Sequence, residues 1–157
     1  LSPEFLVPKI DLKTAPRRAG TGYPPPYDER CKLRERLQLG DAAGLTQFGV
    51  NLLRLPPGQW SSQRHWHSAE DEFVYVVEGE VVLVSDQGEQ VLGAGDCAGF
   101  IAGVANGHHL QNRTGRDVLL LEVGSRRPET DAADYPDIDL MYPARGHGYT
   151  HKDQTPY

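Results

Sequence analysis

Short apolar segments separated by glycine-containing breaks follow one another through the middle of the chain. The segments that predict strands are residues 45–55, 62–67, 71–78, 80–85, 89–93, 96–100, 107–112 and 117–124. None of them shows a convincing helical period of 3.6 residues. Many short strands joined by glycine turns are typical of an all-β sandwich or barrel.

Three of these segments are apolar on both faces rather than alternating. They are residues 73–77, 81–84 and 118–123. Strands of this kind must be covered on two sides. One side would be the barrel interior, and the other a second sheet, an arm of the chain or a partner subunit. We therefore expect a homodimer whose two-fold interface covers the outer face.

The flanking sequences differ in composition from the central segments. Residues 6–44, rich in Pro, Gly and charge, are interpreted as an N-terminal arm in which residues 31–39 are a candidate early strand. Residues 45–124 are interpreted as the barrel. Residues 125–157 are rich in Asp, Pro, Gly and Tyr. Disorder is one interpretation of this end, but its tyrosines and aliphatic side chains favour an ordered C-terminal arm packed on the barrel. Residues 1–5 resemble a cloning scar.

Composition excludes several classes of partner. The net charge is −6, whereas nucleic-acid and anionic membrane surfaces are bound by basic proteins. No apolar run approaches the roughly 20 residues of a membrane span, and no signal-peptide pattern opens the chain. Cys31 and Cys97 fit neither a zinc knuckle nor a redox pair. We expect a cytoplasmic protein that acts on a small molecule.

The candidate chemistry begins with two histidines spaced two residues apart. In a strand, this spacing places His65 and His67 on the same face, and Glu72 follows at the start of the next apolar run. A solvated polar patch would explain an isolated pair. Two imidazoles and a carboxylate from neighbouring strands would also serve as ligands for a borderline divalent metal.

A resemblance to a known family favours the metal. Gly58, His65, His67, Glu72 and Gly79 resemble the first motif of the cupins, and residues 95–112 resemble the second, which supplies a last ligand as H-x3-N. His108 and Asn112 fit that spacing, whereas His109 would need Asn where Arg113 stands. The loops depart from the usual pattern: the segment between Gly58 and His65 is one residue longer, and that between Gly103 and His108 two residues longer.

The chain therefore resembles small single-domain bacterial cupins, some of them labelled sugar-phosphate-isomerase-like. The resemblance implies a single double-stranded β-helix, or jelly-roll barrel, with extended arms at both ends. It also implies one divalent metal ion held by His65, His67, Glu72 and His108, with Glu72 and His108 as the catalytic residues.

Strand parity predicts the walls of the pocket. The side chains expected to face inward with the ligands are Gln63, Val74, Val76, Leu110 and Asn112. Such an interior is mainly aliphatic: the parity forces no inward Lys or Arg, and it places no second carboxylate or inward Lys to transfer protons. A phosphate would then find only Arg54 or arm residues as partners, and Glu70 is expected to be a solvated turn residue.

Three classes of function follow. The first, slightly favoured, is an oxygenase that uses Fe and O2, because such an enzyme needs few acid/base groups from the protein. The second is a metal-dependent isomerase, epimerase or lyase, with Zn, Mn, Ni or Co also possible and a sugar phosphate as one substrate. The third is a non-catalytic barrel that binds a small ligand.

Overall fold

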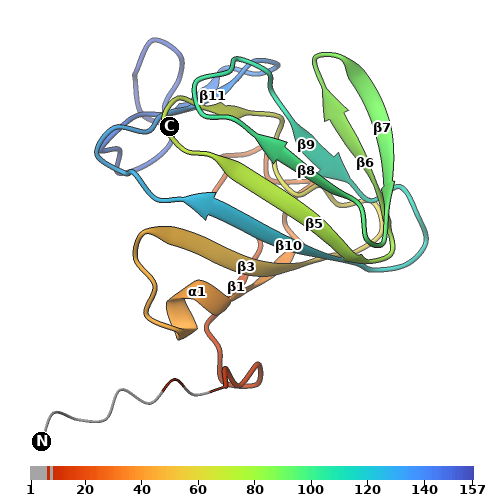
Figure 1. Ribbon diagram of the computed structural model, residues 1–157. Helices are drawn as coiled ribbons and strands as arrows, with labels where there is room; N and C mark the ends of the chain where they lie inside the picture. The colour runs from red at the N-terminus through yellow and green to blue at the C-terminus, as the bar shows by residue number, and fades with distance from the viewer. Residues whose placement is uncertain (1–6, 8) are drawn as a thin grey trace, which may run out of the picture.

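The computed structural model describes residue 7 and residues 9–157, so the cloning-scar interpretation lies outside the described residues. The described chain is all-β apart from one short helix (Figure 1). Its elements are β1 Arg17–Ala19, β2 Glu35–Gln38, α1 Leu39–Ala42, β3 Phe48–Leu55, β4 Trp66–His67, β5 Glu72–Glu78, β6 Glu80–Ser85, β7 Gly88–Gly93, β8 Cys97–Phe100, β9 His109–Gln111, β10 Val118–Ser125, β11 Ala133–Tyr135 and β12 Leu140–Tyr142.

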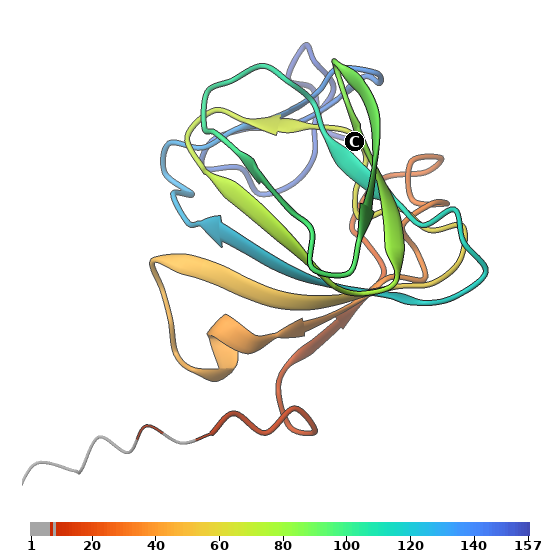
Figure 2. The ribbon, with the colours of Figure 1, turned by 45° about the vertical axis from the view of Figure 1, so that its right-hand side comes forward.

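Two antiparallel sheets enclose the core. A six-stranded sheet has the order β1-β2-β3-β10-β5-β8, and a three-stranded sheet has the order β7-β6-β9. Figures 1 and 2 show the second sheet standing over the first. Their facing side chains form one apolar core that includes Leu53, Val76 and Leu120 from the large sheet and Val81 and Leu110 from the small one. The jelly-roll prediction is confirmed.

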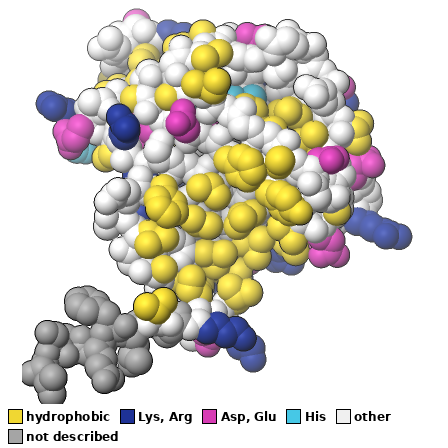
Figure 3. Space-filling model, in the orientation of Figure 1, with side chains coloured by type: hydrophobic (Ala, Val, Ile, Leu, Met, Phe, Trp, Pro, Cys, Tyr) yellow, Lys and Arg dark blue, Asp and Glu magenta, His cyan; other side chains and the backbone are white. Residues whose placement is uncertain are grey.

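The alternation of β5 decides what faces that core. Val74 and Val76 are 3% and 0% exposed, whereas Phe73, Tyr75 and Val77 on the opposite face are 39–47% exposed. Figure 3 shows hydrophobic side chains gathered over the outer face of the large sheet. Neither arm covers this face within the described chain, so the partner expected there stays a prediction.

The predicted strand at residues 62–67 is mostly irregular. Only Trp66 and His67 form a strand, and His65 makes an isolated bridge to His108. Just before this segment, the Ser61 hydroxyl accepts a hydrogen bond from the Leu110 amide at 2.9 Å, and the Ser61 amide donates to the Leu110 carbonyl at 2.8 Å. These two bonds hold the chain against β9 shortly before the histidine pair.

Both arms are ordered and lie against the barrel. β1 and β2 extend the large sheet, so the boundary expected at residue 44 does not coincide with a sheet edge. β11 pairs with β4 and β12 in a third sheet, which lies at the upper end of the molecule in Figure 1. Tyr23 and Cys31 from one arm pack with Tyr135 and Leu140 from the other in a second apolar cluster. No helix in the described chain is long and apolar enough to cross a membrane.

Candidate metal centre

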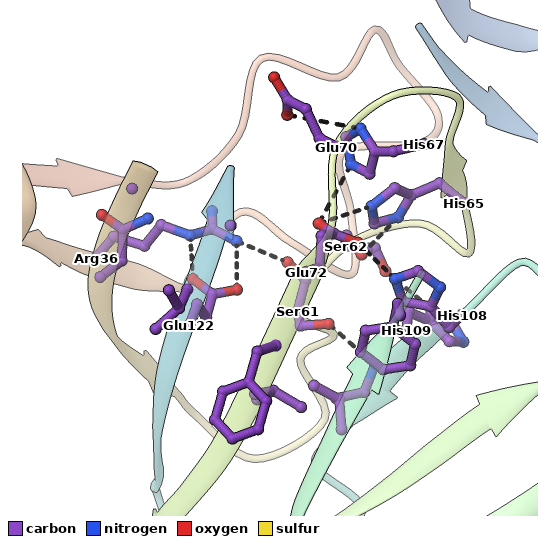
Figure 4. A pocket seen from close by; sticks show the side chains of 18 of the residues that line it. Arg36, Ser61, Ser62, His65, His67, Glu70, Glu72, His108, His109 and Glu122 are labelled. Carbon is purple, nitrogen blue, oxygen red and sulfur yellow. Dashed lines mark hydrogen bonds and ion pairs between the residues drawn. The ribbon is translucent and has the colours of Figure 1, made fainter. Parts of the chain in front are cut away.

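The four predicted ligands come together at one end of the barrel. His65 and His67 lie at β4, Glu72 begins β5, and His108 precedes β9. The Glu72 carboxylate stands in the middle, with its Oε1 3.5 Å from His65 Nε2 and 3.2 Å from His67 Nε2, and its Oε2 2.6 Å from His108 Nε2. Figure 4 shows the imidazoles directed at this carboxylate.

Hydrogen bonds at Nδ1 determine which ring nitrogen of each histidine faces the centre. His65 Nδ1 is 2.9 Å from the Gln63 carbonyl, His67 Nδ1 is 2.7 Å from Asp131 Oδ2, and His108 Nδ1 is 3.2 Å from the Asn106 carbonyl. Carbonyl and carboxylate oxygens only accept, so each Nδ1 donates and each Nε2 can present its lone pair to the centre.

This donor set fits a metal ion. Three nitrogen lone pairs and a carboxylate converge on one point, and a divalent cation is the partner that satisfies them together. His65, His67 and Glu72 in particular have ligand atoms within 4.8 Å of one another. The hydrogen bonds at Nδ1 orient metal-bound histidines in this way in many proteins.

The electrostatics of the cluster favour positive charge. Burial alone would lower the pKa of His67, but hydrogen bonds to Asp131 and Glu72 raise this pKa to about 10. Burial acts against ionisation of Glu72 too, yet the surrounding imidazoles hold its pKa well below the usual range. The carboxylates therefore outweigh desolvation and attract a cation to this point.

His109, the alternative to His108, faces away from the cluster. Its Nδ1 donates to the Ser62 carbonyl at 2.8 Å, and its Nε2 is 3.0 Å from the Gln111 side-chain amide. The ring packs edge-on against Trp60, and burial lowers its pKa to about 4. Both ring nitrogens are occupied, so His109 has none to offer a metal. His108, in contrast, is held by stacking on Phe100 at a centroid distance of 3.6 Å.

A cavity of about 460 Å³ adjoins the cluster, within the range of small-molecule sites. Val74 and Leu110 line it as expected. Val76 does not, because it lies deeper in the apolar core. Neither does Gln63, whose amide donates to the Tyr27 carbonyl at 2.8 Å. Asn112 also lies outside the lining, because its amide bonds the carbonyls of Leu55 and Arg116 and holds a loop.

The cavity contains arginines that strand parity did not place there. Arg18, Arg34 and Arg36 line the cavity, and all three come from the N-terminal segment. β2 pairs with β3 so that Arg36 lies opposite the buried Leu53, which turns the polar face of β2 inward. The polar alternation of residues 34, 36 and 38 was the only local sign of this.

The cavity also contains carboxylates besides Glu72. Glu122 of β10 receives two hydrogen bonds from the Arg36 guanidinium, at 2.7 and 3.2 Å. Glu70 lines the cavity with a side chain that is only 20% exposed, and burial raises its pKa. The prediction of a solvated turn residue is therefore wrong for Glu70, since the Arg127 amide fixes its Oε1 at 2.6 Å.

Comparison with known proteins agrees with this geometry. Residues 51–124 match the model of the cupin domain. The crystal structure of a cupin-superfamily sugar phosphate isomerase from Silicibacter pomeroyi is 49% identical, with 96% of each chain covered and a TM-score of 0.88. No functionally curated protein matches the chain.

Two more distant structures share the fold. A protein from Acidithiobacillus ferrooxidans, provisionally named a sugar phosphate isomerase, is 29% identical over 80% of each chain, with a TM-score of 0.71. A predicted oxalate decarboxylase from Thermotoga maritima is 25% identical, covers 60% of this chain and 81% of its own, and has a TM-score of 0.52. With its jelly-roll barrel, its histidine and glutamate cluster and a relative aligned along nearly its whole length, the chain belongs to the cupin superfamily.

Proposed function

We propose that this cupin is a metal-dependent isomerase, epimerase or lyase that acts on small hydroxy-carbonyl compounds, with phosphorylated sugars as the leading class. One observation carries the proposal: the cavity beside the metal cluster contains two carboxylates outside the ligand set, Glu70 and Glu122, together with arginines. The names of the Silicibacter and Acidithiobacillus relatives support the same class.

In this proposal His65, His67, Glu72 and His108 hold one divalent ion. When bound, the ion would act as a Lewis acid that draws electron density from a substrate carbonyl. The nitrogen-rich ligand set suits Zn, Fe, Mn, Co or Ni. The three imidazoles and Glu72 come from separate segments of a rigid barrel, so their positions are determined by the fold.

The protein's own contribution is proton transfer. An aldose–ketose interconversion moves one proton from C2 to C1 and one from O2 to O1, with no net change in oxidation state. Glu70 is the candidate base for the carbon-bound proton, since it borders the ligand cluster and its Oε2 is not hydrogen-bonded to an amide. Glu122, held in place by Arg36, is the candidate partner for a hydroxyl group.

An oxygenase would need neither carboxylate. The argument for one was that no acid/base group and no cation shared the interior with the metal, and Glu70, Glu122 and Arg36 remove that argument. The isomerase, epimerase or lyase class uses such groups directly, because a proton must be taken up and returned within hydrogen-bond reach of the substrate.

The test is turnover without oxygen. Full-length protein loaded in turn with Zn, Mn, Co and Fe would be incubated anaerobically in D2O with aldose and ketose phosphates and followed by NMR. We expect a new sugar phosphate that carries deuterium beside its carbonyl carbon. Glu70→Gln should abolish this exchange while retaining the metal. Glu129→Gln, which changes an exposed carboxylate paired with Arg145, should not.

Turnover that requires O2 would contradict the proposal and restore the oxygenase. Unchanged exchange in Glu70→Gln would remove that residue from the proton-transfer role and leave Glu122 as the candidate.

A further inference from the structure

We infer that Arg18 and Arg34 of the N-terminal segment form a binding site for the phosphate group of a phosphomonoester, in the part of the cavity that this segment lines. The inference rests on the proposed function, which it extends by naming the part of the substrate that this segment holds.

Strand register places the guanidinium groups on one face. Arg18 of β1 lies directly opposite Arg36 of β2. Arg34 precedes Arg36 by two residues and so extends from the same face of an extended chain. Arg36 in turn lies opposite Leu53, on the inner side of the large sheet. The three cations therefore line the same cavity as the metal cluster.

Their charges are not balanced. Only Arg36 has a carboxylate partner, in the bidentate pair with Glu122. Within the described residues, neither Arg18 nor Arg34 forms an ion pair. Like charges on facing strands destabilise a sheet, and the exposed Arg18 is free to contact an anion that enters the cavity.

Arg34 is the more unusual of the two, because it is only 6% exposed. Its Nε donates to the Gly20 carbonyl at 3.0 Å and its Nη1 to the Ser61 carbonyl, while Tyr23 packs against the guanidinium at 5.6 Å. Carbonyls satisfy these donors but supply no negative charge. A buried cation with no carboxylate in direct contact is costly, and burial lowers the pKa of Arg34 although Glu122 acts on it from a distance.

The charge and donor geometry of the two arginines suit a phosphate group. Neither guanidinium is paired with a carboxylate, and a phosphomonoester carries about two negative charges near neutral pH. Guanidinium groups present several N–H donors in one plane, which suits the tetrahedral oxygens of phosphate. Because the cavity is continuous with the cluster around Glu72, one substrate could present its carbonyl to the metal and its phosphate to the arginines.

Binding of inorganic phosphate tests the site without turnover. Full-length protein in EDTA, where phosphate has no metal to bind, would be titrated calorimetrically with phosphate and with acetate at matched ionic strength. We expect saturable binding of phosphate, weaker binding of the monoanion acetate, and a loss of at least about tenfold in phosphate affinity in Arg18→Gln.

Arg17→Gln is the matched control. Arg17 neighbours Arg18 in β1 but pairs with Glu35 and is absent from the cavity lining, so its replacement should leave phosphate binding unchanged. Arg34→Gln should weaken binding as Arg18→Gln does, with thermal unfolding used to verify its fold. Equal phosphate affinity in wild-type and Arg18→Gln protein, or an equal loss in Arg17→Gln, would overturn the inference.

Kinetics separate this inference from the proposed function. If sugar phosphates are turned over, Arg18→Gln should raise KM for them and leave kcat/KM for the unphosphorylated sugars unchanged. Turnover with an unchanged KM would overturn the phosphate site and leave the isomerase proposal standing. Phosphate binding that depends on Arg18, in a protein that converts no sugar phosphate, would support the site and contradict the isomerase.

Discussion

Replacing Asp131 by Asn should weaken metal binding although Asp131 is not one of the predicted ligands. Its Oδ2 accepts the His67 Nδ1 proton at 2.7 Å, and its Oδ1 accepts the amides of Ala69 and Glu70 at 2.9 and 3.1 Å. An Asn side chain has one acceptor and one donor end. If its oxygen keeps the two amides, its NH2 group faces Nδ1, and His67 must move its proton to Nε2.

That tautomer blocks the nitrogen that faces the metal. The loss can be estimated from the bond that disappears, a charge-assisted hydrogen bond worth about 1.5–3 kcal/mol. At about 1.4 kcal/mol per factor of ten this corresponds to roughly 10- to 100-fold in affinity, which is also the usual effect of removing such a partner of a metal-bound histidine. The side chain is nearly isosteric, so the C-terminal arm should stay in place.

Affinity would be measured by competition with a chromophoric chelator, using Zn²⁺ and Co²⁺. Asp139→Asn is a close control, because Asp139 holds His151 Nδ1 at 2.7 Å and the Lys152 amide at 2.8 Å, away from the cluster. An unchanged affinity in Asp131→Asn, or the same loss in Asp139→Asn, would refute the reasoning.

Three further predictions concern stability and assembly. Gly79 has φ of +90°, and a Cβ there would lie 3.0 Å from Val118 Cγ2. Gly79→Val should therefore lower the free energy of unfolding by more than about 1 kcal/mol. Gly88→Val is the control and should lower Tm less, because Gly88, at φ of +112°, lies in open space. Light scattering should show that the wild-type protein is a dimer and that Tyr75→Asp, which changes the exposed face of β5, is a monomer. Val91→Asp is the control and should remain a dimer. A monomeric wild type would contradict this prediction. Burial raises the pKa of Tyr23 above its ordinary 10. The contribution of Tyr23 to stability is therefore complete below pH 10 and is lost as the pH rises above 10. A Tyr23→Phe variant whose Tm falls as steeply as that of the wild type above pH 10 would refute this assignment.

Local patterns in the sequence were sufficient to predict the candidate metal ligands that the structure brings together. Alternation along β5 separates Val74 and Val76 from Tyr75, and the same period of two puts His65 and His67 together. The choice of His108 over His109 came from the spacing to Asn112, although Asn112 itself holds a loop. Family spacing thus selected the histidine that contacts Glu72, without revealing what the asparagine does.

The residues that surround the ligands depend on contacts between distant parts of the chain. Asp131 reaches His67 across 64 positions, and Arg36 reaches Glu122 across 86. No local pattern reports that β2 joins the large sheet with Arg36 opposite Leu53. The N-terminal segment was therefore predicted only as an arm, and its residues were named only as a group of candidate phosphate partners.

The most direct test of the account is the metal content of the histidine variants. Protein would be purified without chelator or nickel resin, reconstituted anaerobically with each candidate metal, and analysed by mass spectrometry for bound ions per chain. We expect about one ion per chain in the wild type and in His109→Ala, and almost none in His67→Ala or His108→Ala. A wild type that retains no metal, or a His109→Ala variant that loses as much as His108→Ala, would contradict it.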